Sequence, residues 1–410
     1  MMNSLLRKIL AAGRLTRNGR LAEATLAIQR ALAPHADGRA VPTPHGSAMS
    51  GAPRQATAGD VVIEIDDVRV VGDDGSEAAV ARDEPAIAEP AAPDTPLDVA
   101  RFFQSSYTGE AGTRTFKLFK PAGFGDTALP LIVMLHGCTQ SPDDFAAGTR
   151  MNELAQEHGC LVLYPAQAPR SNAHKCWNWF SPADQRRGAG EPALIAGMTR
   201  HVTQTHQVDT DRIFVAGLSA GGAMAAILAG EYPDLFAAAG IHSGVPPGVA
   251  RDVATAFSAM KSGPGSASSL RPPPAARSSA RDEAVRPPRE GGASPRAPVI
   301  VFHGSADATV VPANGDAMIA ATLADAAAGA RREVERAPEA NGRSFRRTIW
   351  RAGDGDDTAP SLAEQWLVDG APHAWSGGAS AGSYTDPSGP DASREMLRFF
   401  LEHPRRQERR

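Results

Sequence analysis

The sequence predicts an α/β fold in which helices cover both faces of a doubly wound, mainly parallel sheet. Short, wholly apolar runs of strand length alternate with amphipathic segments of helix length between residues 131 and 403. Of the 410 residues, 42% are hydrophobic and 21% are charged, which is typical of a globular domain. A Gly-x-Ser-x-Gly segment, 217–221, stands between an expected strand and an expected helix. In such a fold we expect the ligand site at the carboxyl ends of the strands.

The apolar runs are predicted to be buried parallel strands, because both faces of a central strand in such a sheet are covered. The segments between them carry apolar residues at helical spacing and are predicted to be helices. We expect strands over 131–136, 160–164, 213–216, 237–242 and 299–303, and helices over 149–158, 192–206, 220–231, 314–328 and 391–403.

The remaining segments define the domain organisation. Residues 1–33 carry leucines and isoleucines at helical spacing and are expected to form two short amphipathic helices, with an organellar presequence as the alternative. Residues 34–99 and the insertion 261–296 are rich in Ala, Pro and Gly, and bury too little apolar surface to offset their ordering entropy. We expect both to be disordered. Residues 100–404, apart from the insertion, form the predicted α/β domain.

Charge, hydropathy and cysteine content exclude several classes of function. With 42 Lys and Arg against 46 Asp and Glu, the net charge is −4, so we expect no nucleic-acid partner. No apolar run reaches the roughly 18 to 20 residues of a membrane span. The 3 cysteines are too few for a disulfide framework or a zinc site, and we expect no metal and no cofactor. No secretory signal is visible, which predicts a cytoplasmic protein, and nothing identifies a protein partner.

Ser219 is the predicted nucleophile. It is the serine of Gly217-Leu218-Ser219-Ala220-Gly221, directly after the expected strand 213–216 and at the start of an Ala-rich helix. A turn this tight leaves no room for side chains at its flanking positions and lifts the serine hydroxyl above the sheet. The motif alone is weak because Gly and Ser are common, but its strand-turn-helix context favours a nucleophile over an ordinary turn.

A serine nucleophile needs a base, and the base needs an acid that orients it. In this type of fold the acid and the histidine follow the serine in that order, each on a loop after a later strand. Asp307 follows the strand 299–303, and His373 follows the apolar stretch 366–368, so we assign them as acid and base. The rivals are Asp316 for the acid, and His303 and His403 for the base.

An acyl-transfer site also needs backbone amides that bind the oxyanion of the tetrahedral intermediate. One predicted donor is the amide of Ala220, which follows the nucleophile. The second is the amide of Cys138, in the loop 136–140 that directly follows the strand 131–136. A reactive Cys138 thiol is the alternative, although no partner for it suggests itself.

These motifs resemble those of the polyhydroxybutyrate depolymerase-type family of serine esterases, over about 102–403 without the insertion. The resemblance implies an α/β-hydrolase fold and a triad of Ser219, Asp307 and His373. One departure is Ser305, where relatives often carry an acidic residue. Family members are often extracellular, which contrasts with the missing export signal. The matching segments are His-Gly-Cys-Thr-Gln (136–140), Cys-Trp-Asn-Trp-Phe (176–180), Gly-Leu-Ser-Ala-Gly-Gly (217–222), His-Ser-Gly (242–244), 302–307 and 373–378.

The resemblance also implies a disulfide between Cys138 and Cys176, because the two cysteines occur together in the family's motifs. Cys160 lies inside an expected strand and is predicted to be a small buried hydrophobic residue. The aromatic loop 176–180 can line an apolar substrate groove or form a buried cluster. We assign three tryptophans as candidate substrate contacts: Trp177, Trp179 and Trp375.

Together these observations predict a metal-free serine esterase that cleaves short-chain hydroxyalkanoate or similar esters through an acyl-enzyme on Ser219. Because no separate binding domain follows the last expected helix, soluble oligomers or simple esters are expected rather than insoluble polymer. The alternative is an esterase that removes feruloyl or acetyl groups from xylan, since those enzymes share the motifs. A non-catalytic interaction module is a third reading, and the intact set of serine, aspartate and histidine argues against it.

Overall fold

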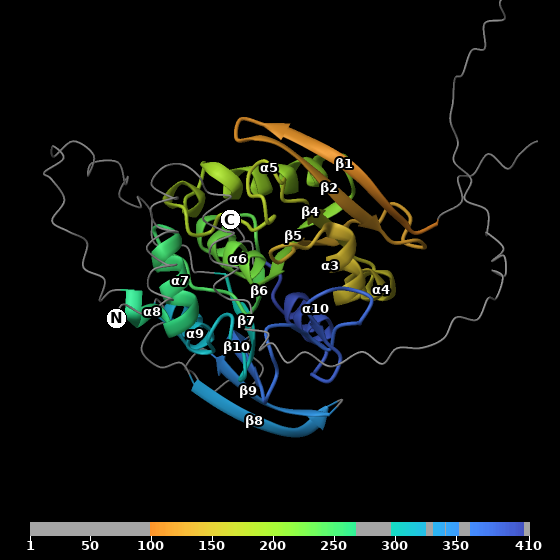
Figure 1. The fold of residues 1–410 in the computed structure, drawn as a ribbon. Coiled ribbons are helices and arrows are strands. Elements are labelled where there is room, and N and C mark those ends of the chain that lie inside the picture. Colours follow the sequence, from red (N-terminus) through yellow and green to blue (C-terminus); the bar gives the residue numbers. More distant parts are fainter. Residues whose placement is uncertain (1–98, 268–296, 325–330, 341, 352–360, 406–410) are drawn as a thin grey trace, which may run out of the picture. The chain divides into compact units, whose positions relative to one another are not determined.

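The computed structural model describes residues 99–267, 297–324, 331–340, 342–351 and 361–405 (Figure 1). The predictions for residues 1–33, for the linker up to residue 98 and for 268–296 lie outside these residues. The first part of the predicted insertion is helical instead, because α7 (Val253–Ser262) and α8 (Pro264–Ala267) cover it. Lys261 is tied to the domain through a hydrogen bond from its Nζ to the Ala308 carbonyl. The predicted start of the insertion at residue 261 was therefore wrong.

Ten strands form one sheet, in the order β1-β2-β4-β3-β5-β6-β7-β10-β9-β8. The six central strands, β4, β3, β5, β6, β7 and β10, run parallel to one another. The hairpin β1–β2 pairs antiparallel with β4 on one side of them, and the hairpin β8–β9 pairs antiparallel with β10 on the other. The carboxyl ends of the six parallel strands therefore lie side by side in a row. This row of strand ends is the edge of the sheet at which we expect the site. The strands are β1 (Arg101–Gly109), β2 (Gly112–Lys120), β3 (Leu129–Leu135), β4 (Leu161–Pro165), β5 (Val208–Leu218), β6 (Ala238–His242), β7 (Val299–Gly304), β8 (Arg331–Ala340), β9 (Arg343–Arg351) and β10 (Ser361–Val368).

Helices pack against both faces of this sheet (Figure 1). One core cluster takes side chains from α5, α6, α7 and α9, and the other takes them from α3, α4 and α10. Among the described residues, no helix combines the length and the hydropathy needed to cross a bilayer. The further elements are α3 (Pro142–Thr149), α4 (Met151–His158), the 3-10 helix η1 (Pro182–Gln185), α5 (Gly190–Thr205), α6 (Ala220–Glu231), α9 (Ala313–Leu323), α10 (Ala392–Glu402), and the short strands β11 (Trp375–Ser376) and β12 (Thr385–Asp386).

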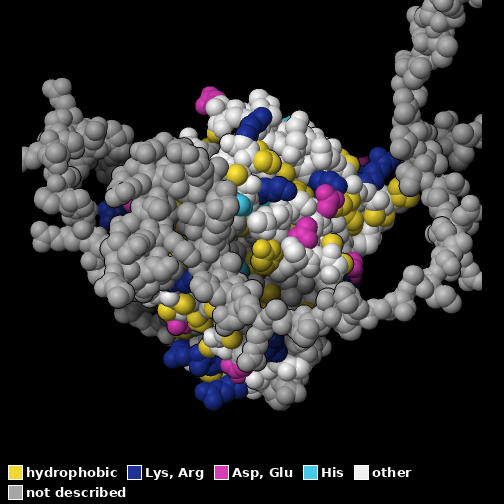
Figure 2. Space-filling model, in the orientation of Figure 1, with side chains coloured by type: hydrophobic (Ala, Val, Ile, Leu, Met, Phe, Trp, Pro, Cys, Tyr) yellow, Lys and Arg dark blue, Asp and Glu magenta, His cyan; other side chains and the backbone are white. Residues whose placement is uncertain are grey.

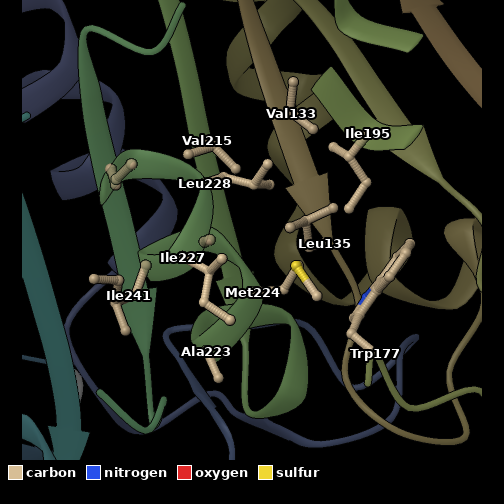
Figure 3. Close-up of a cluster of buried hydrophobic side chains, with 14 of the residues drawn as sticks. Val133, Leu135, Trp177, Ile195, Val215, Ala223, Met224, Ile227, Leu228 and Ile241 are labelled. Atoms are coloured by element: carbon tan, nitrogen blue, oxygen red, sulfur yellow. The ribbon is translucent and has the colours of Figure 1, made fainter. Parts of the chain in front are cut away.

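The central strands are apolar throughout because each supplies both cores. Along β3, Leu131, Val133 and Leu135 pack in one cluster, whereas Ile132 and Met134 pack in the other. Figure 3 shows Val133 and Leu135 beside side chains of β5, β6, α5 and α6. This two-sided burial explains why the central strands read as continuous apolar runs, and it confirms the predicted α/β architecture.

The edge hairpins have a different composition, and they were not predicted. β1 contains no buried residue, and β9 contains only three, Phe345, Thr348 and Ile349, among Arg and Ser residues that are half-buried. Lys and Arg side chains gather over β8 and β9 (Figure 2). Several are paired: Arg347 bonds Glu364 at 3.0 Å and lies 3.3 Å from Glu335.

Candidate active site

Ser219 occupies the sharp turn between β5 and α6. Its φ of 57° and ψ of −117° belong to a region that residues with a side chain rarely adopt. The turn is held from outside, because the Ser219 amide donates to the carbonyl of His242, at the end of β6, over 2.9 Å. The side chain is half-buried, and its Oγ makes no hydrogen bond to any described residue. The predicted strand-turn-helix context is thus observed, with the hydroxyl unengaged.

Close backbone contacts require glycine on both sides of Ser219. A Cβ on Gly217 would lie 2.4 Å from the carbonyl of Gly221, and a Cβ on Gly221 would lie 2.0 Å from the carbonyl oxygen of Leu135. Any larger residue would push the backbone apart. The first turn of α6, with the Ala220 amide, therefore lies directly against the end of β3.

Asp307 and His373 are in direct contact at the same edge of the sheet. They follow β7 and β10, which are parallel neighbours. The Nδ1 of His373 and the Oδ2 of Asp307 are 2.7 Å apart, and the other carboxylate oxygen accepts the amides of Thr309 and Val310 at 2.9 and 2.8 Å. Because the Nδ1–H group of His373 donates a hydrogen bond to the carboxylate, the Nε2 atom carries no proton and can accept one.

The environment of Asp307 keeps its carboxyl ionised. Burial would raise its pKa, but the hydrogen bond and charge of His373, the Val310 amide and His303 outweigh burial, so the pKa lies below its ordinary value. The Nε2 of His303 lies 3.5 Å from the carboxylate and bonds the Val310 carbonyl at 2.8 Å. An ionised Asp307 can therefore orient His373 and stabilise its charged form.

Of the three rival residues, His303 lies beside the Asp307 carboxylate with its Nε2 bonded to the Val310 carbonyl, and the other two are engaged elsewhere. Asp316, on α9, accepts a hydrogen bond from Gln365 at 2.7 Å. His403 bonds the carbonyls of Phe399 and Ser361, each at 2.6 Å, and Ser361 begins β10 at the opposite edge of the sheet. The described structure pairs the predicted acid with the predicted base.

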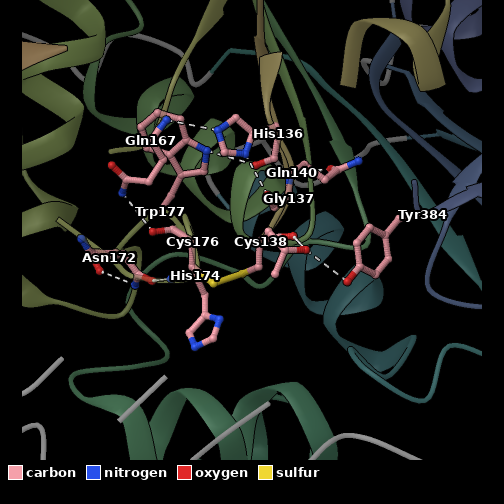
Figure 4. The surroundings of a disulfide bond; sticks show 12 residues. His136, Gly137, Cys138, Gln140, Gln167, Asn172, His174, Cys176, Trp177 and Tyr384 are labelled. Carbon is pink, nitrogen blue, oxygen red and sulfur yellow. Dashed lines mark hydrogen bonds between the residues drawn. A yellow bond between two sulfur atoms is a disulfide. The ribbon is translucent and has the colours of Figure 1, made fainter. Parts of the chain in front are cut away.

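The loop after β3 contains the predicted oxyanion donor and is tethered on one side (Figure 4). Cys138 forms a disulfide with Cys176, the pairing that the resemblance implied. The next amide, of Thr139, donates to the His174 carbonyl at 2.6 Å. The Cys138 and Ala220 amides donate to no described group, and the first amide of a helix has no intrahelical acceptor. Both amides are therefore available to an oxyanion.

Buried polar groups hold this loop from behind (Figure 4). The Nε2 of His136 accepts the Gln167 amide at 3.1 Å, and its Nδ1 donates to the Gly137 carbonyl at 2.8 Å. Burial lowers the pKa of His136 to about 4, so the ring stays neutral. Gln140 accepts the Gly137 amide at 2.8 Å and donates to the Ser383 carbonyl at 3.0 Å. His136, Gly137 and Gln140 belong to the motif 136–140, whereas nothing in the sequence pointed to Gln167 or Ser383.

His242 links the turn of Ser219 to the loop of His373, a role that the sequence did not suggest. Its carbonyl accepts the Ser219 amide, and its Nε2 accepts the Ser376 amide at 3.0 Å, three residues after His373. The ring stacks on Trp375 with centroids 5.1 Å apart. Burial lowers its pKa to about 3, which keeps Nε2 unprotonated and able to accept.

The assignment of three tryptophans as substrate contacts is corrected by their burial. Trp177, Trp179 and Trp375 are only 0%, 7% and 1% exposed. Trp177 donates to the His136 carbonyl at 3.1 Å, and Trp375 donates to the Ser393 hydroxyl at 3.0 Å. The indoles pack in the core beneath the loops, where each of these N–H groups has a partner. Cys160 is buried with a free thiol, as predicted, and burial raises its pKa to about 12.

A buried carboxyl lies behind the disulfide. Glu191, at the start of α5, accepts hydrogen bonds from the side chain of Gln167 and from the amide and side chain of Asn178, the latter two at 2.7 and 2.9 Å. Gln167 also donates to the Cys176 carbonyl at 2.9 Å. Burial, and then the charge of Asp184, raise the pKa of Glu191 to about 7. This carboxyl therefore supports the loop that carries Cys176.

Solved structures share the fold. An acetyl xylan esterase from Aspergillus awamori superposes with a TM-score of 0.51 and 20% identity, covering 73% of this chain and 99% of that one. This likeness supports the α/β-hydrolase fold that the resemblance implied.

Curated proteins match by sequence. Poly(3-hydroxyalkanoate) depolymerase C of Paucimonas lemoignei is 37% identical over 200 residues, 48% of this chain and 45% of that protein. A probable acetylxylan esterase A of Aspergillus clavatus is 33% identical over 185 residues, 45% of this chain and 58% of that protein. Feruloyl esterase B of Thermothelomyces thermophilus is 38% identical over 136 residues, 32% of this chain and 46% of that protein. The chain spans about half the length of the curated relatives it matches.

The model of one protein family matches residues 114–341, which is more than half of the chain. The match includes the turn of Ser219, the loop of Cys138 and the loop of Asp307, and it ends before His373. The chain therefore belongs to the esterase family described as PHB (polyhydroxybutyrate) depolymerase.

Proposed function

We propose that the protein is a serine esterase with Ser219 as nucleophile, His373 as general base and acid, and Asp307 as the group that orients His373. The observation that carries this proposal is the 2.7 Å hydrogen bond between Asp307 and His373, at the same edge of the sheet as the strained turn of Ser219. Strained residues gather at functional sites, and a serine with an unengaged hydroxyl at such a turn fits a nucleophile.

In the proposed reaction, the Oγ of Ser219 attacks the ester carbonyl while its proton passes to the Nε2 of His373. The amides of Cys138 and Ala220 bind the oxyanion of the tetrahedral intermediate. His373 then protonates the leaving alcohol oxygen, and the acyl group remains on Ser219. Water, activated by His373, hydrolyses the acyl-enzyme and restores the serine. The chemistry needs no cofactor.

The proposed substrates are short-chain hydroxyalkanoate or similar esters, supported by the family and by the name of the depolymerase that the chain resembles. A second candidate is the removal of acetyl or feruloyl groups from xylan. It is supported by the acetyl xylan esterase structure, of which 99% is covered, and by the names of the fungal relatives.

A fluorophosphonate probe combined with an ester panel tests this function. The probe should label Ser219 on the wild-type protein, and Ser219→Ala should lose the label and at least about 1000-fold in kcat. The panel contains p-nitrophenyl acetate, hydroxybutyrate oligomers, methyl ferulate and acetylated xylan, and its relative kcat/KM values distinguish the two substrate classes.

Two control variants make the test specific. Ser305→Ala removes an exposed hydroxyl that accepts the Gly370 amide at 2.8 Å and touches neither Asp307 nor His373, and it should leave kcat within about threefold. Asp307→Asn should lower kcat by up to about 10,000-fold, whereas Asp316→Asn should have little effect. Labelling of another serine, or activity that survives Ser219→Ala, would contradict the proposal.

A further inference from the structure

Strained backbone is concentrated around the proposed site. Six non-glycine residues in the described part of the chain have a φ between 50° and 68°. All but Arg150 lie in the turn of Ser219 or in the surrounding loops, and such strain persists where the surrounding structure over-determines it. Tyr384 is unusual among them because a bulky residue in this conformation is rare, and because its side chain is 47% exposed. The other four are Thr139, Lys175, Ser219 and Ser243.

Tyr384 is held between the loop of the base and the loop of the oxyanion donors. Its carbonyl accepts the amide of Trp375, two residues after His373, at 2.7 Å. The preceding residue, Ser383, donates its amide and hydroxyl to Asp144 at 2.8 and 2.6 Å. The phenol oxygen lies 3.3 Å from the hydroxyl of Thr139, the neighbour of Cys138 (Figure 4). The backbone is clamped, and the ring is directed toward the oxyanion loop.

We propose that Tyr384 is a specificity-determining residue that contacts the alcohol part of the ester, so that the site favours alcohols with a ring or a broad apolar face. This inference rests on the proposed esterase function. His373 delivers a proton to the alcohol oxygen, so the alcohol leaves on the His373 side of the oxyanion loop. Tyr384 bridges from the loop of His373 to Thr139, and it therefore lies on this side.

The chemistry of the exposed surface supports the same assignment. The three tryptophans near the site are buried, so they offer little surface to a ligand. The half-exposed ring of Tyr384 offers a flat apolar face, and its hydroxyl group is held by Thr139. Sugar residues and aromatic alcohols are alcohols of this kind, whereas ethanol is not.

Benzyl acetate and ethyl acetate provide the test, because they form the same acetyl-enzyme and differ only in the alcohol. Tyr384→Gly suits the positive φ and removes the ring. It should lower the ratio of kcat/KM for benzyl over ethyl acetate about tenfold, which corresponds to about 1.4 kcal/mol. The rate of acetyl-enzyme hydrolysis should not change, since the alcohol has left by then. Tyr384→Phe keeps the ring and should keep the ratio within about twofold.

Phe103→Ala is the matched control, because it removes another exposed aromatic ring, from β1, and should leave the ratio unchanged. A wild-type ratio in Tyr384→Gly would overturn the proposal. So would an equal loss on both esters together with slower acetyl-enzyme hydrolysis, which would mean that Tyr384 only supports the loops. Fluorophosphonate labelling of Ser219 keeps the two hypotheses apart: an unlabelled wild-type Ser219 refutes the esterase function, and a labelled one with an unchanged ratio refutes only the role of Tyr384.

Discussion

Two buried imidazoles near the site, those of His136 and His242, act as neutral connectors. Burial lowers the pKa of His136 to about 4 and that of His242 to about 3. A neutral imidazole has one N–H donor and one acceptor nitrogen, so it can accept a hydrogen bond from a backbone amide and donate another hydrogen bond from the other nitrogen. His136 and His242 receive the amides of Gln167 and Ser376 in this way. A phenylalanine of similar size would leave such an amide unpaired, at a cost of about 1–3 kcal/mol.

The raised pKa of Glu191 predicts a pH-dependent stability. Its pKa moves from 4.5 to about 7 on folding, so between these values the folded state holds a proton that the unfolded state has lost. This contribution to stability is therefore present at low pH and falls as the pH rises through this window, by on the order of 3 kcal/mol. The attraction of Arg114, 3.8 Å away, is weaker than the effect of burial.

Glu191→Gln removes this titration. Measured by urea unfolding from pH 4.5 to 8, the free energy of unfolding of the wild type minus that of Glu191→Gln should decrease as the pH rises. Gln204→Ala changes an exposed residue on α5 that carries no titrating group and should give a difference that is nearly constant with pH. A constant difference for Glu191→Gln as well would mean that this carboxyl is ionised throughout.

At the scale of elements, the sequence predicted the central strands because they are apolar on both faces. It predicted most of the helices because their apolar residues recur at helical spacing. The motif residues could be placed because each follows one of these central strands. The edge hairpins β1–β2 and β8–β9 could not be recognised in this way, because polar residues interrupt their strands and no continuous apolar run marks them. The hydrogen bonds of His242 connect Ser219 with Ser376, which are far apart in the sequence. They could not be predicted because they depend on the packing of β6 between β5 and β7.

The disulfide joins the loop of Cys138, the proposed oxyanion donor, to the loop of Cys176. The two cysteines are separated by 38 positions in the sequence. In the chain-entropy model a loop of this size contributes up to about 3 to 4 kcal/mol. The double variant Cys138→Ser, Cys176→Ser should therefore unfold at lower temperature, and its kcat should fall because the Cys138 amide is less firmly placed.

Thiol counting and a matched variant check this prediction. The denatured, unreduced protein, made in an oxidising compartment, should expose one reactive thiol, that of Cys160. Cys160→Ser changes a buried cysteine outside the disulfide and should lower stability modestly without lowering kcat. Three reactive thiols, or equal losses of kcat in both variants, would contradict the role assigned to the disulfide.

At the scale of the whole molecule, the described residues contain every part that the proposed reaction needs. Residues 99–405 supply the ten-stranded sheet, and both core clusters lie within them. Ser219, Asp307 and His373 follow three of the parallel strands, which places them on one edge of the sheet. The first strand of the sheet begins at Arg101, and the sequence predicts that the folded domain begins at residue 100.

This organisation predicts that a chain beginning at Asp98 folds and acts like the full-length protein. Its thermal midpoint should lie within about 2 °C of the full-length value, since 1 kcal/mol shifts a domain of this size by about 2–4 °C. Its kcat/KM for p-nitrophenyl acetate should also be unchanged. A chain beginning at Ala122 is the contrasting variant, because it lacks β1 and β2 and uncovers β4 and core residues that pack on Leu118, which is 0% exposed in the intact domain. We expect it to aggregate or to unfold well below the full-length midpoint. If the chain from Asp98 behaved like the chain from Ala122, residues 1–97 would be part of the folded domain and the boundary would be wrong.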